Sequence, residues 1–136
     1  MVIKFMDIEK VFKNIVLLDL AIFVLLFVSI LIEPEEIASI SESLDTGIWD
    51  ENTIIVIFLG FLIVYLINLI LLYKFISFGK VLYLILFILG IALSFTTGPV
   101  IFSSFTYTLD WISGASSGAI LVLLYFSPIK DKFVKQ

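Results

Sequence analysis

Four long apolar stretches dominate the pattern of hydrophobic and polar positions along the chain. They cover residues 14–32, 53–73, 81–97 and 110–126, and charged residues, proline or glycine stand at nearly every boundary. An α-helix needs roughly 20 apolar residues to cross the hydrocarbon core of a bilayer, so each stretch is close to one crossing. The pattern predicts an all-α membrane protein in which residues 1–136 form a single bundle of four transmembrane helices.

The connection between the first two stretches has a helical periodicity of its own. Its apolar residues recur at steps of three and four positions: Ile37, Ile40, Leu44 and Ile48. Pro34 suits the first turn of a helix, and Glu35 and Glu36 complement the positive end of the helix dipole. We therefore expect residues 34–46 to form a short amphipathic helix on the outer membrane–water boundary, with a disordered acidic loop as the alternative.

The other connections are short or lie near the membrane. Residues 1–13 alternate apolar and charged positions, which favours a place in the interface before the first span. Residues 74–80 form a short turn, which predicts a tight antiparallel hairpin between the second and third spans. Residues 100–109 are apolar and rich in hydroxyl groups, and we expect them to lead to a fourth helix that begins at Asp110, where the helix dipole favours a carboxylate.

Charged residues divide sharply between the two sides of the predicted bundle. All eight lysines fall on one side: Lys4, Lys10, Lys13, Lys74, Lys80, Lys130, Lys132 and Lys135. The connection between the first two spans instead holds seven carboxylates: Glu33, Glu35, Glu36, Glu42, Asp45, Asp50 and Glu51. Cationic residues near span ends are retained in the cytoplasm, so both termini are predicted to be cytoplasmic. The lipid bilayer is an expected partner, because anionic lipids attract lysines beside the membrane.

Composition argues against most catalytic chemistry. Hydrophobic residues make up 62% of the chain and its mean hydropathy is +1.24, so four spans leave no room for a soluble catalytic domain. Cysteine, histidine and arginine are absent, and with them the usual zinc ligands, a histidine base and the guanidinium groups that read nucleic acid. We expect no enzymatic activity, no catalytic residue, no metal site, no cofactor and no nucleic-acid partner.

Asp19 is the ionisable residue that lies clearly inside a span. A carboxylate at membrane depth is costly and commonly marks a pathway or a proton site. Asp19 follows Lys13 by six residues and Asn68 precedes Lys74 by six on the antiparallel second span, so the two are expected at matching depth. A buried polar cluster is predicted, with Asn68 nearest to the carboxylate: Asp19, Asn68, Tyr65 and Tyr83. Three roles stay open: a structural tie between helices, a proton or ion site, and a contact to lipid headgroups.

The fourth span carries a stripe of small residues and several serines. The stripe is expected to let two helices approach closely, within one chain or between two: Gly114, Ala115, Gly118 and Ala119. The alternative is a pore lined by Ser113, Ser116 and Ser117.

The end of the chain has a distinctive pattern: Gly118-Ala-Ile-Leu-Val-Leu-Leu-Tyr125-Phe-Ser-Pro128-Ile-Lys130-Asp-Lys-Phe133, preceded by Trp111 and Gly114. It resembles small four-helix inner-membrane proteins of bacteria that have no assigned activity. The resemblance implies a fold and a place in the bacterial inner membrane. The arrangement of four spans with one carboxylate in the first also looks like the small multidrug-resistance exporters, which have a glutamate there, shorter loops and no acidic outer segment.

Two classes of function follow. The favoured one is a non-enzymatic membrane protein that acts through helix packing, as a homo-oligomer or as an accessory subunit of a membrane complex. The alternative is a small proton-coupled transporter or pore that uses Asp19 and the serines of the fourth span. A polar lining through the outer half of the bundle favours transport, and the first three spans offer only a few small or hydroxyl residues there.

Overall fold

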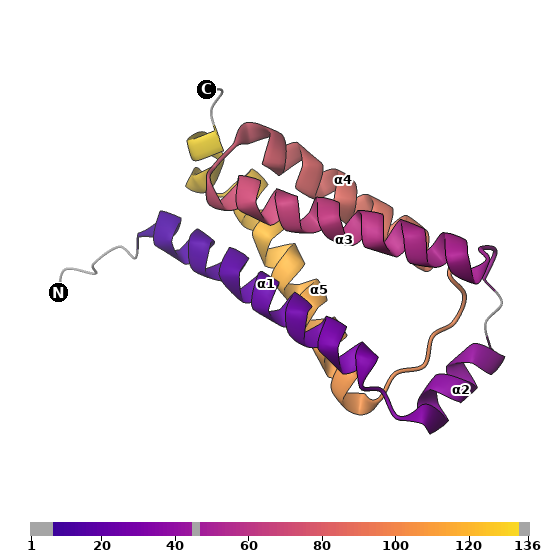
Figure 1. The fold of residues 1–136 in the computed structure, drawn as a ribbon. Helices are drawn as coiled ribbons and strands as arrows, with labels where there is room; N and C mark the ends of the chain where they lie inside the picture. Colours follow the sequence, from indigo (N-terminus) through magenta and orange to yellow (C-terminus); the bar gives the residue numbers. More distant parts are fainter. Residues whose placement is uncertain (1–6, 45–46, 134–136) are drawn as a thin grey trace.

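The computed structural model describes residues 7–44 and 47–133 (Figure 1). Its elements are α1 (Ile8–Leu31), α2 (Glu35–Ser43), α3 (Glu51–Tyr73), α4 (Ser77–Ser94), α5 (Ser104–Phe126) and the short 3-10 helix η1 (Pro128–Phe133). The described residues contain no strand, and α1, α3, α4 and α5 are each long and apolar enough to cross a membrane. The predicted all-α fold with four membrane-spanning helices is confirmed, and α2 occupies the position of the expected short helix.

The four spanning helices form two pairs. The antiparallel pair α3–α4 follows from the short turn between them, and α5 packs along α1 (Figure 1). The pairs lie close together where α1 begins and η1 ends, and they diverge toward α2. We call the first end, with Lys13, the α3–α4 turn and η1, the lysine-rich end, and the opposite end the α2 end.

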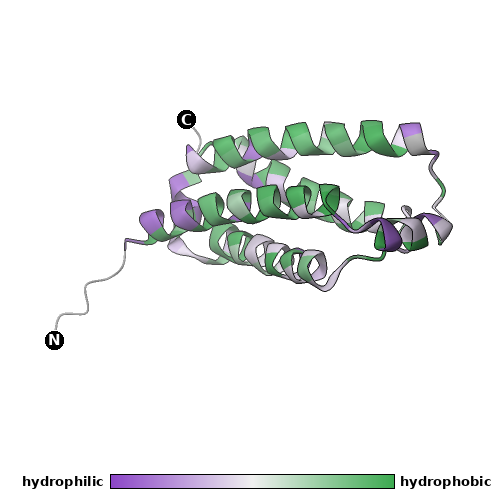
Figure 2. Ribbon diagram, turned by 60° about the horizontal axis from the view of Figure 1, so that its bottom comes forward, coloured by the Kyte–Doolittle hydropathy of each residue, from purple (hydrophilic) through white to green (hydrophobic). Residues whose placement is uncertain are grey.

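The outward faces of the spanning helices are strongly apolar. Figure 2 shows hydrophobic residues along most of α1, α3 and α4 with polar residues near the ends, whereas α5 is paler because its first half is rich in polar and small residues. Large side chains such as Val56 and Phe126 are 70% and 85% exposed, which a water-soluble protein avoids over so wide a surface. Lipid is the medium that covers these faces without cost, so the exposure pattern agrees with an integral membrane protein.

All four spanning helices begin earlier than their apolar stretches predict, α3 by only two residues. α1 starts at Ile8, where the Asp7 side chain accepts a hydrogen bond from the Glu9 N–H at 3.1 Å. α4 starts at Ser77. Residues 8–13, expected to lie in the interface as the run-in to the first span, form the first turns of α1, and their place in the interface stays a prediction. Residues 1–6 lie outside the described part of the chain.

The start of α5 differs from its predicted position by six residues, as much as that of α1. This helix begins at Ser104, where the Ser103 hydroxyl accepts a hydrogen bond from the Thr106 N–H at 3.4 Å. Asp110 therefore lies in the second turn of α5, and its predicted place at the amino end of the helix is wrong. The physical reason is that hydroxyl side chains cap a helix well, so the helix extends through the polar segment ahead of the apolar stretch.

The turn between α3 and α4 depends on a close approach of the two backbones. The N–H of Ile76 donates to the Leu71 carbonyl and that of Phe75 to the Leu72 carbonyl, with Phe75 left-handed at φ 56°. These two bonds form a Schellman motif that ends α3 and reverses the chain. A side chain added at Gly79 would place its Cβ 2.7 Å from the Leu71 Cβ and 3.2 Å from backbone atoms of Leu71 and Leu72. The hairpin therefore requires glycine at this position.

Replacing Gly79 by alanine is expected to destabilise the bundle by about 1–3 kcal/mol, because the methyl group overlaps atoms that cannot move independently of α3. The matched control is Gly60→Ala on α3, where an added Cβ has no heavy atom within 4 Å. Thermal unfolding in detergent, followed by circular dichroism, should show a lower midpoint for Gly79→Ala only. Equal midpoints for the two variants would mean that the helices do not depend on this contact.

Candidate functional site

The carboxylate of Asp19 joins α1 to each of the other spanning helices. Its side chain is fully buried. Oδ1 accepts a hydrogen bond from the Ser116 hydroxyl of α5 at 2.6 Å, and Oδ2 accepts one from the Tyr65 hydroxyl of α3. The Tyr83 hydroxyl of α4 lies 3.5 Å from Oδ2 and donates to it as well. One acidic group is therefore satisfied by hydroxyls from three helices.

Periodicity explains why Asp19 points inward. The buried residues of α1 recur at helical spacing along one face: Phe12, Val16, Asp19, Ile22 and Ser29. Asp19 lies in the middle of this face, where its partners replace the water that a carboxylate would otherwise require. On insertion scales an aspartate costs about 2.5–3.5 kcal/mol at the centre of a span, so a site inside the bundle is strongly favoured over one facing lipid.

Asn68 does not bind Asp19, and the predicted contact between them is wrong. The Asn68 amide is fully buried and, oriented to satisfy its neighbours, donates to the Gly79 carbonyl at 2.9 Å and accepts from the Tyr83 N–H at 3.2 Å. It therefore bridges one turn of the α4 backbone. The absence of a side chain at Gly79 brings that backbone within reach, while hydroxyls already satisfy the carboxylate.

A cavity of about 430 Å³ lies between the helix pairs on the α2 side of Asp19. Its aromatic walls come from α1, α3 and α4: Phe23, Phe61, Tyr65, Tyr83 and Phe87. Its polar lining comes mainly from α5, with one residue of α4: Ser94, Asp110, Ser113 and Ser117. Ser94 and Asp110 are exposed, whereas Tyr65 and Tyr83 are buried. The cavity thus runs from an exposed rim to the two tyrosines that bind Asp19.

The serines of α5 divide between the cavity and the buried carboxylate. Ser113 and Ser117 line the cavity. Ser116 points instead to Asp19. Of the three serines expected to line a pore in the alternative prediction, Ser113 and Ser117 therefore lie at the cavity and Ser116 does not, whereas Ser94 and Asp110 were not predicted to lie there.

The stripe of small residues on α5 does not pack closely within the chain. A Cβ added at Gly114 or Gly118 would have no heavy atom within 4 Å, and Ala115 and Ala119 are exposed. α5 uses another face against its neighbours, with Leu109, Ser116, Ile120 and Leu124 buried. The expectation of close packing through the stripe is therefore wrong within a single chain.

The bundle is closed on the opposite side of Asp19. Toward the lysine-rich end four large side chains have no exposed surface: Phe12, Leu72, Leu124 and Ile129. Asp19 consequently has an open cavity on one side and these buried apolar residues on the other, beside which a smaller apolar groove of about 230 Å³ lies between α1 and α3.

A second polar site joins α1 to the start of α5 at the α2 end. The Glu33 carboxylate accepts hydrogen bonds from the Ser103 N–H, from the Ser103 hydroxyl at 3.1 Å and from the Thr106 hydroxyl at 2.8 Å. The hydrogen bond from the Ser103 N–H is the main reason that the pKa of Glu33 lies below its usual value. Nothing in the sequence separates Glu33 from the other carboxylates of its acidic segment, so this role was not predicted.

Among residues 7–44 and 47–133, no group of three acidic, histidine or cysteine side chains comes together to hold a metal ion. Comparison with protein-family models, with curated proteins and with solved structures finds no match to the chain. The geometry of the site is therefore the basis for a functional proposal.

Glu33→Gln is expected to lower the thermal midpoint at pH 7, because the charge that suits the amino end of α5 is lost. A carboxylate whose pKa is lowered by folding stabilises the fold above its unfolded-state value near 4.5, and this contribution disappears as the pH falls through the lower folded value. The difference between wild type and variant should therefore shrink below pH 4.5. Glu42→Gln, at an exposed position on α2, is the control. A constant difference down to pH 3 would contradict this role.

Proposed function

We propose that this integral membrane protein is a non-enzymatic, small proton-coupled transporter in which Asp19 carries the proton. The observation behind the proposal is the position of Asp19 between an open cavity and a closed end of the bundle. A transporter that exposes its site alternately to the two sides needs such an asymmetry in each of its states. The cavity volume of about 430 Å³ falls within the range of small-ligand pockets.

Hydroxyl groups connect the cavity to the carboxylate. Tyr65 lines the cavity and donates to Asp19 Oδ2. A hydroxyl both donates and accepts, so Tyr65 can pass its proton to Asp19 while it receives another from the cavity side. Each O–H bond that breaks is replaced, and the net change is one proton on the carboxylate. A protonated Asp19 is neutral, which lowers the cost of moving it inside the membrane.

We also propose that the lysine-rich end faces the cytoplasm of a bacterial cell, with the protein in the inner membrane. The support is the sequence, in which residues 14–73 and 81–129 contain no lysine. The cavity would then open to the outside in this structure.

Asp19→Asn tests the proton role. The amide is nearly the same size and still accepts hydrogen bonds, but it cannot carry a proton. In proteoliposomes under an imposed membrane potential, with a pH-sensitive dye inside, wild-type protein should give proton flux above that of empty liposomes. Asp19→Asn should return the flux to the empty-liposome level, whereas Asp131→Asn, at an exposed carboxylate of η1, should retain it.

Wild-type flux in Asp19→Asn would show that the carboxylate is only a structural tie. A circular dichroism melt of each variant separates loss of flux from loss of folding.

A second candidate is function through helix packing, as a homo-oligomer or as an accessory subunit of a membrane complex. The observation in favour is that the stripe of Gly114, Ala115, Gly118 and Ala119 faces no helix of its own chain at short range. In membranes such stripes allow two helices to approach closely, because apolar burial gives no net drive to associate in lipid.

Gly118→Leu tests this candidate. The leucine enters open space within the chain, so the monomer should keep its fold and thermal midpoint, while an oligomer should dissociate to monomers in mild detergent. Gly60→Leu adds the same side chain to open space on α3 and is the control. Size measurement by light scattering should show a change for Gly118→Leu alone. The same monomeric size in wild type and both variants would argue against self-association.

A further inference from the structure

The end of the chain folds back over the lysine-rich end of the bundle. Ser127 is extended, with φ −113° and ψ 167°, and its hydroxyl donates to the Leu123 carbonyl at 2.6 Å and accepts from the Ile129 N–H at 3.1 Å. Pro128 has no N–H to continue α5. The break is therefore a defined bend, and it directs η1 across the bundle toward α1 instead of away from it.

η1 contributes to an aromatic cluster that closes this end. The ring of Phe133 lies 5.8 Å from that of Phe12 and 5.3 Å from that of Phe75, and the rings of Phe12 and Phe75 are 5.6 Å apart. We call these three residues, from three distant segments, the aromatic plug. Phe12 precedes Asp19 by seven residues, which is about 10 Å along α1. The plug thus lies between Asp19 and the lysine-rich end.

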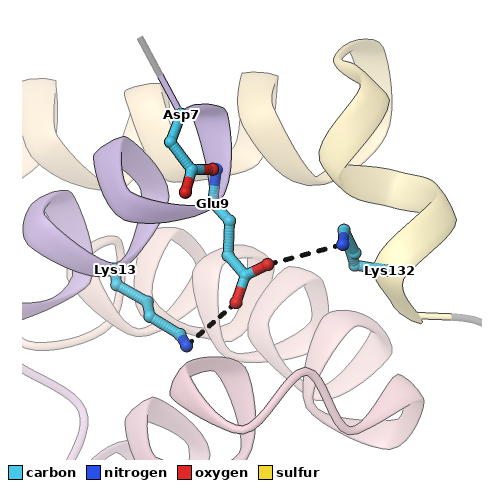
Figure 3. Close-up of polar contacts among 4 residues, drawn as sticks. All are labelled: Asp7, Glu9, Lys13 and Lys132. Atoms are coloured by element: carbon cyan, nitrogen blue, oxygen red, sulfur yellow. Dashed lines mark hydrogen bonds and ion pairs between the residues drawn. The ribbon is translucent and has the colours of Figure 1, made fainter.

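One ion pair holds η1 to α1. The Glu9 carboxylate pairs with Lys132 of η1 at 3.4 Å and with Lys13 of its own helix at 3.0 Å (Figure 3). Within the described residues, Lys130 of the same 3-10 helix makes no ion pair. The Lys132 side chain is 56% exposed, so the pair is weak. A weak tie suits a segment that must both close and release.

We infer that η1 is a gate, held shut by the Glu9–Lys132 pair, whose movement removes Phe133 from the aromatic plug and opens a route from the lysine-rich end to Asp19. The inference rests on the proposed function, because a transported proton must leave Asp19 toward the end that is closed here.

Because the chain contains no cysteine, one introduced thiol can report the access of water to the region beneath the plug. Val16 is buried on α1, one turn from Phe12 and less than one turn from Asp19. Val16→Cys changes the volume little and creates the single thiol of the chain. In lipid nanodiscs, its reaction rate with a charged methanethiosulfonate reagent reports how often the plug opens to water.

Lys132→Gln and Glu9→Gln should each raise this rate about two- to fivefold, the change expected for loss of one exposed ion pair. Lys130→Gln, the matched control, should leave the rate unchanged. The double variant Glu9→Gln/Lys132→Gln should react no faster than the faster single variant, because both changes remove the same interaction. Unchanged rates in Lys132→Gln, Glu9→Gln and the double variant, or rapid reaction already in the Val16→Cys parent, would overturn the gate.

Measurements of proton flux distinguish failure of the proposed gate from failure of the proposed transport function. Lys132→Gln should increase Asp19-dependent flux in proteoliposomes, and Lys130→Gln should not. Flux that depends on Asp19 but is unchanged in Lys132→Gln would leave the transporter proposal standing and reject the gate. Faster thiol reaction without any Asp19-dependent flux would show a movable η1 and reject proton transport.

Discussion

A carboxylate inside the hydrocarbon layer has no water to solvate it, and in this bundle hydroxyl groups from three helices meet that requirement at Asp19. The bonds from Tyr65, Tyr83 and Ser116 fix the rotation of α1 and bring α3, α4 and α5 to one depth. Because lipid gives helices no hydrophobic drive to associate, such polar contacts have more influence on their arrangement than they would in water.

The rest of the architecture arises from unequal packing at the two ends. Near the lysine-rich end, Gly79 lets α4 approach α3, Asn68 bonds to the α4 backbone, and the aromatic plug fills the centre. At the α2 end the helix pairs diverge, and Glu33 ties α1 to α5 without joining them to α3–α4. The cavity is the result of this divergence.

The structural and chemical roles of Asp19 are compatible, since the same hydroxyls serve both. Tyr65 satisfies the carboxylate and lines the cavity, so it ties α1 to α3 and is also the group that passes the proton in the proposed function. A group that binds three helices changes their contacts when its charge changes. Under the proposed function, one side chain couples proton binding to helix movement, and the proposed gate at η1 is where that movement takes place.

The sequence by itself determined the four spans, the short helix between the first two and the inward face of Asp19, because apolar length and helical periodicity are properties of local sequence. It placed Asn68 at the right depth but with the wrong partner. It named Ser113 and Ser117 as a polar lining only in its alternative, and it missed Ser94, Asp110, Glu33 and the return of η1. Those features depend on how far apart two backbones lie, which helix turns toward which, and where the chain bends at Ser127–Pro128. Such distances are set by packing between segments remote in the chain, so only the tertiary structure decided them.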